Sequence, residues 1–204
     1  MRNVSAQAAP DDNAASTLRA ETIPAFRMAQ IMLVLVGAKA QGSKLDLERL
    51  SVIEFLSANP FLVVDEDSPA SNQLRLQGFG RHSITYASPS QRFVSRRERV
   101  TSDIAQLVAF GLVQLTVHEG QRVFTVTESG QQAADSLYSV YADAYRLSVA
   151  TVTPIVMKLS SPKMRERLET WLRVDPVLFD LFDSPTMDEF ESEASGLPPR
   201  DMLF

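Results

Sequence analysis

Residues 112–130, LVQLTVHEGQRVFTVTESG, constrain the fold of this chain more than any other stretch. Val113, Leu115 and Val117 alternate with polar residues, which is the period of a half-buried β-strand. HEGQ supplies a turn around Gly120, and RVFTVT returns as the partner strand. Because two strands alone are only marginally stable, this hairpin is expected to pack against helices.

The residues just before the hairpin predict one of those helices. In SRRERVTSDIAQLVAFGLV, Val100, Ile104 and Leu107 recur at helical spacing and so mark a face that packs on a core. Gly111 follows at the position of a left-handed C-cap. The strand therefore leaves directly from the end of an amphipathic helix.

Helices are also expected upstream. A first helix is predicted from Pro24, a favourable first-turn residue, to about Gln41, and it is apolar nearly all round its middle. A second is predicted from a cap at Asp46 to Pro60, and residues 65–73 are expected to form a polar loop.

Further helices are expected downstream of the hairpin. Thr127 is placed to cap a helix that runs to about Tyr145, and Pro154 should kink the chain or start a new segment. A clearer helix follows from Ser161, with Pro162 in its first turn.

This order predicts a mainly α chain with a small β-hairpin: a winged helix-turn-helix with additional N- and C-terminal helices. The expected organisation has four parts, namely a flexible N-terminal arm (1–22), a winged-helix domain with its N-terminal helix (23–146), a helical extension (147–174) and an acidic-apolar tail (175–204).

Composition narrows the class of protein. The chain has no cysteine, so a disulfide framework and a thiolate metal site are excluded, and a cytoplasmic location is expected. The most apolar run, Ile31–Ala38, is far shorter than the roughly 20 residues of a membrane-spanning helix. No membrane association is expected.

Signals for catalysis are nearly absent. His82 and His118 are far apart in sequence and lack the spacing of metal ligands. GFGRHS has two of the glycines of a dinucleotide-binding loop but neither the third nor a βαβ frame. The sequence therefore predicts a non-enzymatic protein with no cofactor and no metal.

A cluster of arginines is the most informative charged feature. Between Arg75 and Arg99 there are six arginines and one acid, Glu98, in a chain whose net charge is -5. Their planar guanidinium groups suit phosphates and guanine edges, but arginine is also frequent at protein interfaces. The arginines could therefore contact nucleic acid, or they could pair with an acidic partner surface or with the protein's own acidic tail, and both interpretations remain open. The candidate contacts to DNA or to an acidic partner are Arg81, Arg92, Arg96, Arg97, Arg99 and Arg122.

The tail after Val174 interleaves acidic and apolar residues. Such a segment is either a disordered end or one that folds when it docks on a partner, and the terminal DMLF favours docking. The candidate docking residues are Phe179, Phe182, Phe190, Leu203 and Phe204.

Together these segments resemble a known family. RRERVTSDIAQLVAFGLVQL, with the helix over Ser102–Val113, and VFTVTESGQQAADSL, with TESG at Thr127–Gly130, are similar to the middle components of bacterial ABC-three-component systems. In particular they resemble the small winged-helix subunit of Lamassu-type anti-phage defence complexes. LERLSVIEFLSANPFLV and the helices over 138–172 fit the same layout, so the resemblance covers residues 24–172.

The resemblance implies a non-catalytic subunit that joins an SMC-like ABC ATPase to an effector, often a nuclease, in anti-phage or anti-plasmid defence. It also implies weak contact with double-stranded DNA, without sequence preference. The alternative is a transcriptional regulator, whose flanking helices would form a dimer that binds a palindromic operator. The two differ in whether the chain forms a stable dimer alone.

Overall fold

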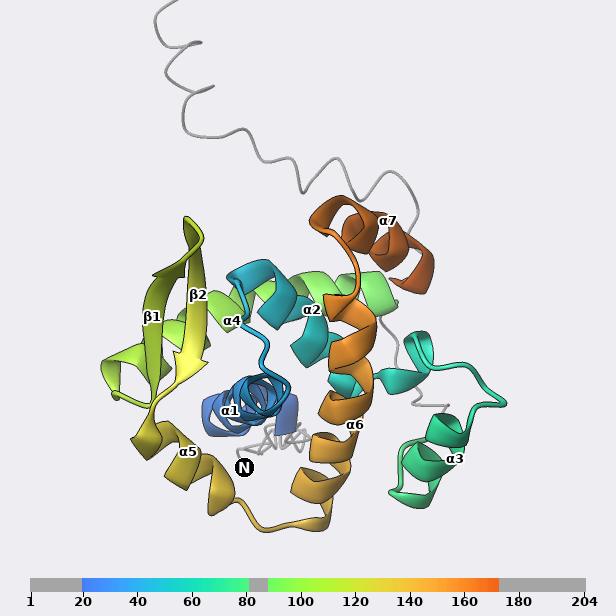
Figure 1. Cartoon of the computed structure of the whole chain (residues 1–204). Coiled ribbons are helices and arrows are strands. Elements are labelled where there is room, and N and C mark those ends of the chain that lie inside the picture. The colour runs from blue at the N-terminus through green and yellow to red at the C-terminus, as the bar shows by residue number, and fades with distance from the viewer. Residues whose placement is uncertain (1–19, 81–87, 173–204) are drawn as a thin grey trace, which may run out of the picture.

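The computed structural model describes residues 20–80 and 88–172, and it is mainly helical with one antiparallel hairpin (Figure 1). Its elements in chain order are η1 (Ala20–Thr22), α1 (Pro24–Ala40), α2 (Leu47–Ala58), η2 (Pro60–Leu62), α3 (Pro69–Leu76), α4 (Pro89–Ala109), β1 (Val113–His118), β2 (Gln121–Val126), α5 (Glu128–Asp135), α6 (Val140–Met157) and α7 (Ser161–Leu172).

The core forms where α1, α2, α4 and α6 meet. α1 contacts the other three, and Figure 1 shows it in the middle of the fold. Ile31 and Val34 of α1 are fully buried, as are Ile53 of α2 and Val152 of α6. The predicted first helix is thus confirmed, and its all-round apolar character reflects burial on several sides.

Side-chain caps fix where the helices begin. Asp46 accepts a hydrogen bond of 2.7 Å from the backbone N–H of Arg49, as the sequence predicts for the second helix. Ser88 forms a capping box with Gln91, so α4 begins at Pro89, before the Arg-rich stretch rather than within it.

The predicted hairpin is confirmed, and its register places Val113 opposite Val126 and His118 opposite Gln121. Glu119 and Gly120 both have positive φ, as a two-residue hairpin turn requires. The prediction of a half-buried first strand is wrong, however. Only Val113 of β1 is buried, because the hairpin projects beyond the helices and leaves the rest of this strand to solvent.

The base of the hairpin is fixed on two sides. The backbone N–H of Phe124 donates to the carbonyl of Leu45, the residue just before the cap of α2, over 2.8 Å. On the other side, Thr127 caps α5, and Gly130 approaches so closely that a Cβ there would lie 2.0 Å from the carbonyl oxygen of Leu112. The glycine of TESG is therefore required by close backbone packing.

Two segments differ from expectation before and after the hairpin. The predicted polar loop 65–73 contains the start of α3, which Ser68 caps as Ser88 caps α4. The helix that Thr127 starts ends at Asp135 instead of running to about Tyr145, because α6 begins anew at a cap on Ser139.

The end of the described chain is helical. α6 continues through Pro154 to Met157, so this proline does not start a new segment. It lies in the last turn, so the N–H that it lacks costs α6 the hydrogen bond to the carbonyl of Ala150, and little of the helix follows it. α7 begins at Ser161 as predicted and buries Met164, Leu168 and Leu172. No helix in residues 20–80 and 88–172 is long and apolar enough to cross a membrane.

Candidate functional site

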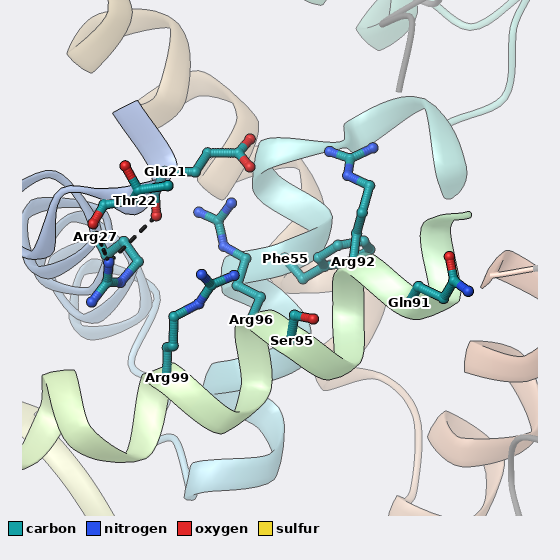
Figure 2. A pocket seen from close by; sticks show the side chains of 9 residues that line it. All are labelled: Glu21, Thr22, Arg27, Phe55, Gln91, Arg92, Ser95, Arg96 and Arg99. Atoms are coloured by element: carbon teal, nitrogen blue, oxygen red, sulfur yellow. Dashed lines mark hydrogen bonds between the residues drawn. The ribbon is translucent and has the colours of Figure 1, made fainter. Parts of the chain in front are cut away.

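The arginines of α4 occupy two different environments. Arg92, Arg96 and Arg99 are spaced by four and three residues, so they share one side of the helix. Figure 2 shows all three side chains on the side of α4 that faces η1 and the start of α1. Arg97 is exposed on the surface outside this group.

Arg96 is a buried structural residue. Its Nε donates to both carboxylate oxygens of Glu54 over 2.7 Å, and its Nη2 bonds to the same carboxylate and to Gln30. Glu54 and Arg96 are 1 % and 6 % exposed. That guanidinium holds α2 against α4 inside the fold, so Arg96 is not the exposed contact that the sequence suggests, and its predicted contact with DNA or an acidic partner stays a prediction.

A polar network extends from this ion pair into the core. Gln30 donates to the Tyr141 hydroxyl over 2.6 Å, and the Tyr145 hydroxyl donates to the backbone carbonyl of Glu54 over 3.0 Å. Burial raises the pKa of Tyr141 to about 12, although 42 % of the residue as a whole is exposed. The network thus joins α1, α2, α4 and α6 at one level of the fold.

Charge pairing inside the network sets the state of its central groups. Burial raises the pKa of Glu54, and Arg96 opposes that rise. Burial also lowers the pKa of Arg96, but the Glu54 carboxylate outweighs it, so the pKa lies above its usual value. We take both groups as ionised at neutral pH, because the guanidinium donates to both carboxylate oxygens.

A second ion pair joins α1 to α4. Arg27 donates from Nε and Nη2 to the two carboxylate oxygens of Asp103 over 2.7 and 2.8 Å. Asp103 is buried, and its hydrogen bond with Arg27 raises the pKa of that arginine. Asp103, the acidic residue of SDIAQLVAF, therefore pairs with an arginine inside the fold.

The other candidate arginines differ in accessibility. Arg92 is partly buried and donates to the side-chain oxygen of Asn59 over 2.8 Å. Arg97 and Arg99 on α4 and Arg122 on β2 are exposed. Arg81 lies outside the described residues, as do all the candidate docking residues of the tail, Phe179, Phe182, Phe190, Leu203 and Phe204.

Exposed apolar side chains are a feature that the sequence analysis missed. Val108, Phe110, Leu115 and Val117 are 38, 64, 47 and 72 % exposed, and we call them the apolar hairpin surface. They come from the end of α4 and from β1, two elements that contact each other. Leu115 and Val117 lie on the same face of the strand as the buried Val113, which is why their pattern predicted burial.

A smaller apolar group lies at the start of α6. Tyr138 and Val140 are 88 and 79 % exposed, beside Tyr141, whose ring packs on that of Phe26 with centroids 5.2 Å apart. Large apolar side chains exposed in this way are typical of protein-binding surfaces.

No group of histidine, aspartate or glutamate residues in the described part of the chain could hold a metal ion. His118 lies on the hairpin, where its Nδ1 is 3.1 Å from the ammonium of Lys44. Comparison of the chain with protein-family models, curated proteins and solved structures gave no match.

Proposed function

We propose that this chain is a non-catalytic winged-helix subunit of a cytoplasmic assembly built on an SMC-like ABC ATPase. It would join that ATPase to an effector subunit such as a nuclease in anti-phage or anti-plasmid defence. The order α1, α2, α4, hairpin, α5 supports a winged-helix assignment, as does the attachment of β2 to the segment between α1 and α2.

The apolar hairpin surface carries the proposal. In a winged helix that reads DNA, the exposed side of the recognition helix and the hairpin meet the bases and phosphates, and both therefore need polar or cationic side chains. Here the hairpin instead exposes Leu115 and Val117, and the helix ends in the exposed Phe110. Such a surface favours burial against another protein.

The outer side of α4 agrees with this interpretation. One line of exposed positions passes from Arg97 through Thr101 and Ala105 to Val108, and only the first of these four is cationic. A regulator that recognises an operator would need several base-reading side chains along this line. Weak contact with duplex DNA fits better, and Arg97 and Arg122 are the exposed residues that we assign to it.

Co-expression tests the proposal. The tagged full-length chain is produced together with the proteins encoded beside it. It is then purified, and the mass of the complex that it forms is measured. Recovery in a stable complex with an SMC-like ATPase is the expected result. A stable homodimer that leaves those proteins behind and binds its own promoter with strong sequence preference would establish the regulator instead.

The DNA part has a separate test. If Arg97 and Arg122 contact the phosphates of duplex DNA, replacing each by glutamine should reduce the slope of log affinity against log salt by about one unit. An unchanged slope would show that these residues do not contact DNA. It would not bear on the proposed protein complex.

A further inference from the structure

A small polar cleft lies between the start of α1 and the arginine side of α4. It has a volume of about 220 Å³, and Figure 2 shows Arg92, Arg96 and Arg99 directed into it, with Glu21 on the opposite wall. Ser95 also lines it from α4. The cleft is enclosed by secondary structure on both sides and is much too small for a DNA duplex.

The charge of this cleft is not balanced by its own acids. Arg27 and Arg96, which line it, are each paired with one carboxylate, Asp103 and Glu54. Arg92 and Arg99 have no carboxylate within ion-pair distance among residues 20–80 and 88–172. Among the described residues that line the cleft, Glu21 is the only acid, so this part of the chain gives the cleft an excess of positive charge.

Arg96 adds a further donor to Arg92 and Arg99. Its hydrogen bonds to Glu54 and Gln30 use Nε and Nη2. Within the described residues no hydrogen bond engages its Nη1, although the side chain is only 7 % exposed and lines the cleft. Nη1 is not among the buried side-chain atoms that lack a partner, so this nitrogen is open to the cleft, where water or a ligand can accept its hydrogen bond.

We propose that this cleft binds a phosphate group. Arg92 and Arg99 would supply positive charge from the two ends of the cleft. Between them, Arg96 would donate an N–H that its ion pair holds in place, and Ser95 would donate its hydroxyl. The ion pairs of Arg27 and Arg96 hold the walls, so little reorganisation accompanies binding.

A phosphate fits this donor set better than a carboxylate does. Its oxygens point in several directions and can accept hydrogen bonds from several guanidinium groups at once, whereas a carboxylate offers only two oxygens in one plane. Because the cleft excludes a duplex, the phosphate belongs to a free polyphosphate compound or to a single nucleic-acid strand.

Calorimetric titration of the full-length chain with inorganic pyrophosphate tests the proposal. The wild type is expected to bind, R99Q to bind about fivefold more weakly and R92Q/R99Q about tenfold or more weakly. E21Q should act in the opposite direction, with binding about twofold tighter, because it removes a repelling carboxylate from the cleft.

Charge-matched variants on α7 serve as controls. Arg167 and Glu169 are exposed there, so R167Q and E169Q change the net charge as the cleft variants do without touching the cleft. Both should leave pyrophosphate affinity unchanged. Equal weakening by R167Q and R99Q would overturn the proposal, because binding would then follow net charge rather than the cleft.

Two further titrations identify the source of the phosphate. Affinity for a nucleoside triphosphate similar to that for pyrophosphate indicates a free polyphosphate compound. Much tighter, salt-sensitive binding of a single-stranded oligonucleotide, lost in R92Q/R99Q, indicates a nucleic-acid strand. If none of the three probes binds, or if only an acidic peptide with the sequence of residues 175–193 does, the phosphate site is refuted.

The cleft and the apolar hairpin surface share no residue. Loss of pyrophosphate binding and loss of partner capture can therefore be measured separately, and failure of one proposal leaves the other standing.

Discussion

The two ends of α4 use their side chains in opposite ways. At the arginine end, a cation that would ordinarily face water is buried, and Arg96 pairs with Glu54 inside the fold. At the hairpin end, apolar residues that would ordinarily be buried face solvent, with Phe110 64 % and Val117 72 % exposed. One helix thus places charge inside and apolar surface outside.

This contrast separates structural from functional residues. Removing a buried ion-pair partner leaves an uncompensated charge, so substitutions at the arginine end should lower the free energy of unfolding. Exposed apolar side chains contribute little to folding and gain free energy only when a partner covers them. Substitutions at the hairpin end should therefore leave the free energy of unfolding nearly unchanged but weaken the binding of a partner.

The largest expected effect on folding is that of E54Q. This variant leaves the buried Arg96 without its counter-charge and should lower the free energy of unfolding by about 3–5 kcal/mol, measured by urea denaturation. E48Q on the same helix is the matched control. Its ion pair with Arg165 is partly exposed, so a loss of about 1 kcal/mol or less is expected. Equal effects of the two variants would show that the buried pair is not structural.

G130A should have the next largest effect. Its new Cβ would meet the backbone carbonyl of Leu112 at 2.0 Å, which rigid backbone cannot avoid, and a loss of about 1–3 kcal/mol is expected. S129A at the exposed neighbouring position should stay within about 0.5 kcal/mol of the wild type. If G130A is as stable as S129A, the base of the hairpin is less tightly packed than described.

G111A should cost less, because nothing lies within contact distance of a Cβ there. Only the backbone is strained, with φ at 70°, and a loss of about 1 kcal/mol is expected. G111N should recover part of this loss, since asparagine tolerates the left-handed region better than alanine does. Equal stability of wild type and G111A would show that the C-cap of α4 relaxes.

The smallest effect on folding is expected for V117D. This residue lies near the tip of the hairpin, so the free energy of unfolding should change by no more than about 0.5 kcal/mol. A loss of several kcal/mol would mean that the hairpin end belongs to the core, and the contrast between the two ends of α4 would not hold.

Local signals made much of the fold predictable from sequence. The first helix, the cap at Asp46, the hairpin and the start of α7 each depend on residues close together in the chain. The beginnings of α3 and α4 were missed although Ser68-Pro69 and Ser88-Pro89 carry the same cap signal, because neither is followed at once by an apolar helical pattern.

The candidate site was less predictable, because its pairings link distant parts of the chain. Arg96 resembles its neighbour Arg97 in sequence, and only Glu54, which lies in another helix, distinguishes the two. The exposure of Leu115 and Val117 has a similar origin. Alternation shows that they share the face of Val113 but not that the helices end before reaching them.

Partner affinity of hairpin variants tests the central claim most directly. The ATPase encoded beside this chain is titrated with the wild type, with L115D/V117D and with T116D, which adds one charge on the opposite, exposed face of the same strand. We predict that L115D/V117D loses binding while its unfolding curve is retained, and that T116D binds as the wild type does. Unchanged affinity of L115D/V117D would contradict the assignment of the apolar hairpin surface as the docking surface.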